Sequence, residues 1–122
     1  MRSIMIVVDK PKYKMSINED RKQVQVQVIG FIKEEIVEDY MNDLQTTANS
    51  VQKSSYTFVI DATHQSPLPS KVSSSLGETI MFYVSFNFKD YIIVNPTSKI
   101  AQVQIRNAVE GIPYPGIIVD KL

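Results

Sequence analysis

Residues early in the chain alternate between apolar and polar side chains, which is the period expected of a strand with one buried face. Residues 13–17 follow this pattern, and residues 23–28 repeat it with valines alternating with glutamines. The valines are predicted to face a core, and the glutamines to face water or a partner. The polar turn at 18–21 joins the two runs into a hairpin. A β-branched run at residues 4–8, ended by Pro11, predicts a short first strand.

The apolar positions then recur every three or four residues, which indicates helices. Residues 34–51 carry one apolar face and begin with carboxylates, which interact favourably with the positive end of the helix dipole. A second apolar face covers residues 72–84, and Pro69 is suited to the first turn of that helix. A third helix is predicted after a Thr-Ser cap at 97–98, with Gly111 ending it in a left-handed conformation.

Three short apolar runs, at residues 56–60, 91–94 and 116–119, lie between or after these helices. The first two runs are typical of strands that are buried on both faces of a sheet, and the third predicts a last short strand. Helices alternating with buried strands imply right-handed crossovers and parallel strand pairs. The sequence therefore predicts one α/β domain over residues 1–122, with a mixed sheet, an N-terminal hairpin and about three helices packed on the sheet.

The composition is that of an ordinary globular protein, with 43% hydrophobic and 21% charged residues in 122. Thirteen basic residues balance thirteen acidic ones, which argues against binding to nucleic acid. The absence of cysteine excludes disulfides, thiolate metal sites and cysteine nucleophiles, and favours a reducing compartment. Every apolar run is shorter than the roughly 18 residues of a membrane helix. We therefore expect a cytoplasmic protein that binds neither nucleic acid nor membranes.

Asp61 and His64 are the one candidate catalytic pair, in the loop after a predicted strand where open α/β sheets often bind ligands. A general base needs a nucleophile to activate, and the chain has no cysteine and no Gly-x-Ser-x-Gly segment. Its four glycines are too scattered for a phosphate-binding loop. The carboxylates of residues 34–39 have no histidine at helical spacing. We therefore predict a protein that is not an enzyme, with no cofactor and no metal ligands.

Serine side chains gather around the start of the second predicted helix. A helix N-terminus offers free backbone amides, so an anion or a phosphoserine is electrostatically favourable there. Simple capping by a serine-rich polar surface is the competing interpretation. The serines concerned are Ser66, Ser70, Ser73, Ser74 and Ser75.

The order of elements, with residues 59–61 leading into a serine-bearing helix, resembles the STAS domains, which are similar to anti-sigma-factor antagonists. The resemblance extends from Tyr13 to Val119 as topology and hydrophobic spacing. Residues 91–94 followed by 98–111 look especially like the closing strand and helix of that family. The closest likeness is to a divergent bacterial branch without an assigned function.

The regulatory motif of the STAS family is an Asp-Ser-Ser-Gly-like segment that opens the second helix. Its nearest counterpart is residues 73–77, which lack the preceding aspartate and place Leu76 before Gly77. The resemblance implies Ser73, Ser74 and Ser75 as candidate phosphorylation sites.

The STAS-like layout and the missing catalytic constellation together predict a non-catalytic protein-interaction or regulatory module. Its protein partner is expected to dock on the second helix and the loop before it. The residues predicted to bind the partner are Asp61, His64, Ser66, Ser70 and Ser74.

Two further predictions concern ligand binding and self-association. The alternative function is a small apolar-ligand or lipid-binding domain, since methionine and phenylalanine adapt well to pockets. The side chains considered for its lining are Met41, Met81, Phe82 and Phe86. A weak homodimer is also expected, because the glutamine face and residues 4–8 are suited to an exposed sheet edge.

Overall fold

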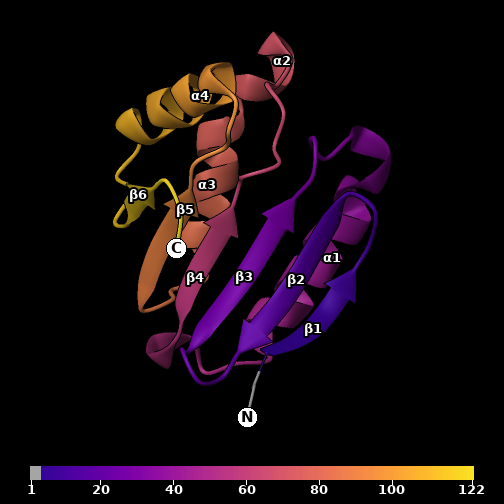
Figure 1. The fold of residues 1–122 in the computed structure, drawn as a ribbon, viewed down its shortest axis with the longest axis vertical. Helices are drawn as coiled ribbons and strands as arrows, with labels where there is room; N and C mark the ends of the chain where they lie inside the picture. Colours follow the sequence, from indigo (N-terminus) through magenta and orange to yellow (C-terminus); the bar gives the residue numbers. More distant parts are fainter. Residues whose placement is uncertain (1–3) are drawn as a thin grey trace.

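The computed structural model describes residues 4–122 and shows a single six-stranded sheet (Figure 1). Residues 1–3 of the predicted domain lie outside the described residues. The strands lie side by side in their order along the chain. They are β1 (Ile4–Asp9), β2 (Tyr13–Asn18), β3 (Gln23–Val28), β4 (Thr57–Asp61), β5 (Asp90–Val94) and β6 (Ile117–Val119).

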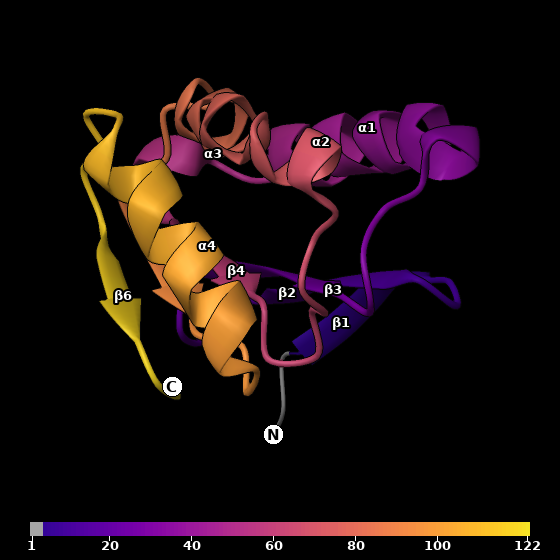
Figure 2. The same ribbon diagram turned by 90° about the horizontal axis from the view of Figure 1, so that it is seen from above.

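The first three strands pair antiparallel, and β3 to β6 pair parallel. The connections between the parallel strands are helical, and Figure 2 shows α1, α2 and α3 lying over one face of the sheet. These helices are α1 (Glu34–Asn49), α2 (Ser70–Ser73), α3 (Leu76–Val84) and α4 (Lys99–Glu110), with a short 3₁₀ turn, η1, at Lys53–Ser55. The predicted mixed α/β fold with an N-terminal hairpin is therefore confirmed.

The core lies between the sheet and the helices. Alternate residues of the strands point into it, as the period of two requires. In β2 these are Tyr13, Met15 and Ile17, and in β3 they are the three valines predicted to face inward. Phe58 of β4 is fully buried and lies at the centre of an aromatic cluster. Its ring centroid is 5.0 to 6.1 Å from those of Tyr83, Phe86, Phe88 and Tyr91.

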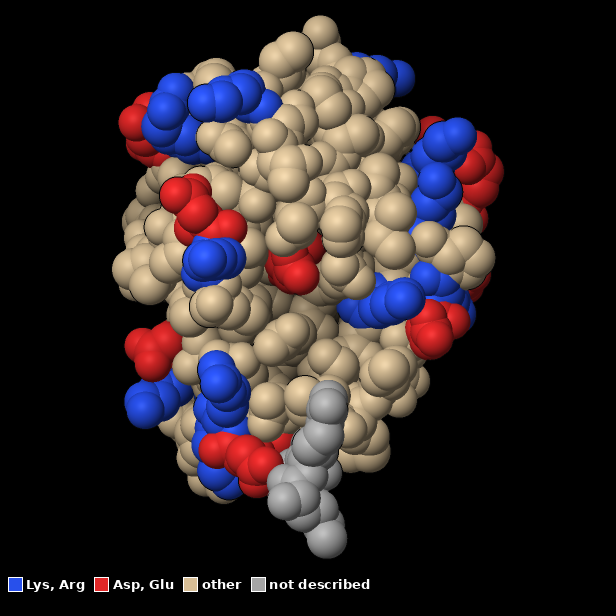
Figure 3. Space-filling model, viewed as in Figure 1, with Lys and Arg blue, Asp and Glu red and all other residues tan. Residues whose placement is uncertain are grey.

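The opposite face of the sheet is the one seen in Figures 1 and 3. The strand register places one uncharged residue from every strand in a row across its middle: Ile6, Ser16, Gln25, Val59, Ile92 and Ile117. Uncharged side chains make up most of the middle of this face, whereas charged ones gather mostly toward its margins (Figure 3). Val59 of β4 is fully buried on this face, between Gln25 of β3 and Ile92 of β5.

The structure corrects two local predictions about helices. The helix expected over residues 72–84 is divided between α2 and α3, because serine hydroxyls bond to nearby carbonyls and compete with regular helix. Ser75 Oγ donates to the carbonyl of Val72, and Ser74 Oγ to that of Lys71. Gly111 ends α4 with a φ of −89°, which is outside the predicted left-handed region. Its N–H donates a hydrogen bond to the carbonyl of Ala108. The predicted serine cap is present, since Ser98 accepts a hydrogen bond from Ala101.

Candidate functional site

Asp61 and His64 each make hydrogen bonds with other residues. Asp61 is the last residue of β4, and its Oδ1 accepts hydrogen bonds from the N–H and the hydroxyl of Thr63. His64 is exposed, and its carbonyl accepts a hydrogen bond from the N–H of Gly30. Within residues 4–122 no hydrogen bond or ion pair joins the two side chains. The carboxylate therefore orders its own turn rather than orienting an imidazole.

The residues predicted to bind a partner lie along the loop and short helix that follow β4. His64, Ser70 and Ser74 are exposed, whereas Asp61 and Ser66 are half-buried. The N–H of Ser66 donates to the carbonyl of Gly30, at a point where the loop runs parallel to the end of the β3 segment. The chain thus presents a polar, mostly exposed face here, but the five side chains do not converge on a single binding site.

The three candidate phosphoserines face two different hollows. Ser73 and Ser74 line a polar groove of about 410 Å³ between α3 and α4. Ser75 instead borders an apolar cavity on the α1 side. The α2 helix has only four residues, so it lacks the aligned peptide dipoles that make a longer helix attractive to anions. The start of α2 therefore offers less to an anion than the start of one long helix would, and anion binding and simple capping both stay predictions.

An apolar cavity of about 330 Å³ lies between α1, α2, α3 and the end of β3. It opens at the carboxyl ends of β3 and β4, the usual ligand side of an open α/β sheet. Polar contributions come from Gln65, Ser75 and Thr79, and from the hydroxyl ends of two tyrosines. Apolar side chains make up most of the wall, among them Val28, Ile32, Met41, Leu68, Val72 and Leu76.

Two tyrosine hydroxyls meet beside this cavity. Tyr40 of α1 and Tyr83 of α3 are buried, and their hydroxyl oxygens are 2.5 Å apart. Burial raises the pKa of Tyr83 to about 12, and burial together with the neighbouring tyrosines raises the pKa of Tyr40 well above its ordinary value. Both hydroxyls therefore stay protonated at physiological pH, and one donates to the other. The pair is a neutral link between two helices.

Sequence reasoning identified only one residue of this cavity. Met41 lines it, as the ligand-binding alternative expected, but Phe82 and Phe86 pack against each other with ring centroids 5.1 Å apart. The remaining lining comes from the segments after β3 and β4, which carry no distinctive motif. An apolar Phe31-Ile32 pair in a connecting segment was the one available signal.

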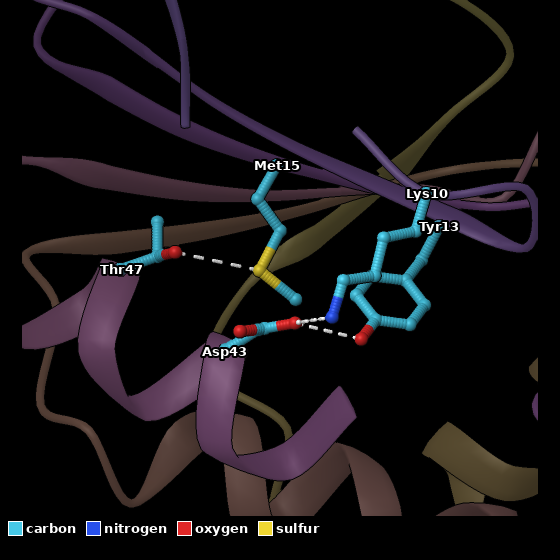
Figure 4. Close-up of polar contacts among 5 residues, drawn as sticks. All are labelled: Lys10, Tyr13, Met15, Asp43 and Thr47. Atoms are coloured by element: carbon cyan, nitrogen blue, oxygen red, sulfur yellow. Dashed lines mark hydrogen bonds and ion pairs between the residues drawn. The ribbon is translucent and has the colours of Figure 1, made fainter. Parts of the chain in front are cut away.

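A polar cluster joins the hairpin to α1 (Figure 4). The Oδ2 atom of Asp43 accepts a hydrogen bond of 2.7 Å from the hydroxyl of Tyr13 and lies 2.9 Å from Lys10 Nζ. These hydrogen bonds, first from Tyr13 and then from Lys10, lower the pKa of Asp43. Nearby, the hydroxyl of the buried Thr47 donates to the sulfur of Met15 at 3.4 Å. The arrangement has the character of a structural clamp.

The outermost strand, β1, is unusually apolar for an exposed position. Four successive residues, Ile4 to Val7, expose between 40% and 63% of their surface. The pairing with β2 shifts between Ile6 and Val8, which places a bulge at this edge. As expected from the sequence, residues 4–8 lie at a sheet edge. The same expectation for the glutamine strand is wrong, because β3 lies inside the sheet between β2 and β4. Self-association through the β1 edge stays a prediction.

Among the described residues no group of three or more His, Cys, Asp or Glu side chains is arranged to hold a metal ion. Within the same residues, every helix falls short of the length and apolar character that a membrane-spanning helix requires.

Comparison with models of protein families, with curated proteins and with solved structures finds no match to this chain. The STAS-like resemblance therefore stays a prediction that rests on the order of elements.

Proposed function

We propose that this chain is a non-catalytic protein-interaction module that binds a partner through the edge of β1. The carrying observation is the run of exposed apolar side chains from Ile4 to Val7 on the outermost strand. An edge strand presents unpaired N–H and C=O groups, and soluble proteins usually protect it with charge, proline or a covering element. Among the described residues, the regular part of this edge, from Ile4 to the bulge after Ile6, has no charged residue and no proline, and no further strand pairs with it.

The mode of binding is strand addition, in which an extended segment of the partner continues the sheet beyond β1. Main-chain hydrogen bonds supply affinity in this mode, and alternate side chains supply specificity. The partner segment is accordingly apolar, since it lies beside Ile4 and Ile6. The bulge shortens the regular edge to about three residues, so the pairing is weak and reversible. A second copy of the chain satisfies the same requirement, which is the basis of the expected weak homodimer.

The STAS-like resemblance suggests a second docking face for a regulatory partner. This face is the loop after β4 and the start of α2, where His64, Ser70 and Ser74 are exposed. Phosphorylation of Ser74 would add a charge of about −1.5 to −2 there and change the polarity of the face. The two faces are separate parts of the surface, so variants can distinguish them.

The test is affinity capture from a lysate of the source organism with four baits. The first two are the wild type and Ile6→Lys, which puts a charge on the edge. Ile117→Lys is the matched control, because Ile117 is 57% exposed on the opposite edge strand and Ile6 is 63% exposed. Ser70→Glu/Ser74→Glu tests the second face.

A partner that is retained by Ile117→Lys and lost by Ile6→Lys supports the proposed edge. Loss with the double serine variant alone moves the docking face to α2. A partner captured equally by all four baits contradicts both placements. Sedimentation equilibrium of wild type and Ile6→Lys at tens of micromolar separates self-pairing from a foreign partner.

A further inference from the structure

We propose that the cavity between α1, α2 and α3 binds a small, uncharged, mainly apolar molecule of one or two rings with a single hydrogen-bonding group. This inference is independent of the β1 edge. It rests on the size of the cavity, on the chemistry of its wall and on the weak attachment of α2, which covers part of it.

The volume of about 330 Å³ fits a ligand of this size. Ligand pockets in proteins commonly span roughly 300 to 1,000 Å³. A cavity of about 150 Å³ holds a single benzene ring when its wall is apolar. The space here is roughly twice that, enough for two rings but too small for a complete lipid.

The wall of the cavity selects against charge. None of the thirteen residues that line it carries a formal charge. An ion that entered would lose part of its hydration without gaining a partner of opposite charge among these residues, which is unfavourable. An uncharged ligand avoids this cost and gains from the removal of its apolar surface from water.

The Gln65 amide is the polar group of the wall that has no hydrogen-bond partner in the part of the chain that the structure describes. By contrast, Ser75 Oγ and Thr79 Oγ1 donate to carbonyls of their own segment, and one of the two hydroxyls of Tyr40 and Tyr83 donates to the other. Within residues 4–122, the side-chain amide of Gln65 makes no hydrogen bond, although it lines the cavity and the smaller hollow behind it. A single donor or acceptor on the ligand is therefore matched by the Gln65 amide.

Entry is provided by α2. This helix has four residues and none is buried, so moving it breaks few packing contacts. Its N-terminal side is held at Leu68, whose N–H and carbonyl bond to the side chain of Gln104 on α4. Val37 of α1, which also lines the cavity, is 40% exposed. A ligand reaches the cavity between these two elements.

The probe for the test is 1-naphthylamine, an uncharged two-ring molecule with one hydrogen-bonding group, and its binding is followed by isothermal titration calorimetry. Its comparator is 1-naphthylamine-5-sulfonate, which has the same rings and an added sulfonate. Both are titrated into the folded wild-type chain. The proposal expects saturable one-to-one binding of the neutral probe, with the sulfonate at least about tenfold weaker, a difference of about 1.4 kcal/mol. Absence of saturable binding, or equal binding of the two probes, overturns it.

Two neighbouring substitutions in α2 locate the site. Val72→Trp fills the cavity, because Val72 lines it, and is expected to weaken neutral-probe binding at least about tenfold. Lys71→Trp adds the same ring at an exposed position outside the lining and is expected to leave binding unchanged. Equal binding by Val72→Trp and wild type overturns the placement.

Circular dichroism checks that each variant is folded. If Val72→Trp does not fold, Thr79→Trp decides the question, because Thr79 lines the same cavity from α3. Ile6→Lys, on the exposed edge, is expected to bind the probe as wild type does. Loss of binding in Ile6→Lys would assign the probe to the edge and contradict the cavity.

Discussion

The two halves of α1 are packed in different ways. Its C-terminal half contributes Leu44, Thr47 and Ala48, all with 0% exposure. Its N-terminal half contributes Val37 and Met41, which border a cavity of about 330 Å³. Both halves follow the same helical apolar period, so the period does not decide how tightly a helix packs. The tightness of packing depends on the neighbouring elements. The C-terminal half of α1 lies over β2 and β3, whereas the N-terminal half lies beside the short α2, which covers it only in part.

The largest expected effect separates these two halves directly. Leu44→Ala is expected to lower the free energy of unfolding by about 2 to 5 kcal/mol, because it opens a void in a closed core. Met41→Ala removes a side chain that already borders a void and is half-buried, so we expect about 1 kcal/mol. Urea denaturation of both variants measures the difference. Equal losses would mean that the cavity is as tightly packed as the rest of the core.

A smaller effect on stability is expected at the hydrogen-bonded pair of Tyr40 in α1 and Tyr83 in α3. Tyr83→Phe leaves the buried hydroxyl of Tyr40 without its partner and is expected to cost about 1 to 3 kcal/mol. The double variant Tyr40→Phe/Tyr83→Phe removes both polar groups and is expected to cost less than the sum of the single variants. Denaturation of the three variants completes a double-mutant cycle. Strict additivity would show that the two hydroxyls do not interact.

The smallest effect is expected at the clamp of Asp43, Tyr13 and Lys10. Asp43→Asn is expected to lower the free energy of unfolding by about 1 kcal/mol at neutral pH, the range for a partly exposed charged hydrogen bond. The folded-state pKa of Asp43 is lowered, so the stabilisation is fully present above the unfolded-state pKa of about 3.9 and is lost as pH falls through the folded value.

The difference in stability between wild type and Asp43→Asn should therefore shrink below about pH 4. Thermal or urea unfolding at a series of pH values measures it, with Asp120→Asn as a control at the exposed end of the chain. A difference that stays constant down to about pH 2.5 would mean that the carboxylate is not stabilised by Tyr13 and Lys10.

The elements with one clear period were predictable from the sequence. The alternation at residues 13–17 and 23–28 placed the correct side chains in the core, because a strand turns its side chains to opposite faces. The buried runs of β4 and β5 were recognised in the same way. The apolar run of residues 4–8 lies at an edge, as expected, whereas the alternation of glutamines did not reveal that β3 lies inside the sheet.

The broken helix was not predictable from apolar spacing. Val72 and Leu76 are four residues apart, which suits one continuous helix. The interruption at Ser74 and Ser75 depends on hydroxyl groups competing with helical hydrogen bonds, and spacing contains no information about that competition. This break also directs Ser74 and Ser75 to different hollows.

By itself, the sequence determined the fold class, the inward faces of the strands and the neutral composition, because these follow from local periodicity and from counting charges. Only the tertiary structure decided that the Thr63 turn holds Asp61 away from His64 and that Tyr40 meets Tyr83. It alone formed a cavity from segments that lie up to 55 positions apart, from Val28 to Tyr83. Contacts between distant segments depend on how helices of different lengths cover one sheet, and this is a property of packing rather than of local pattern.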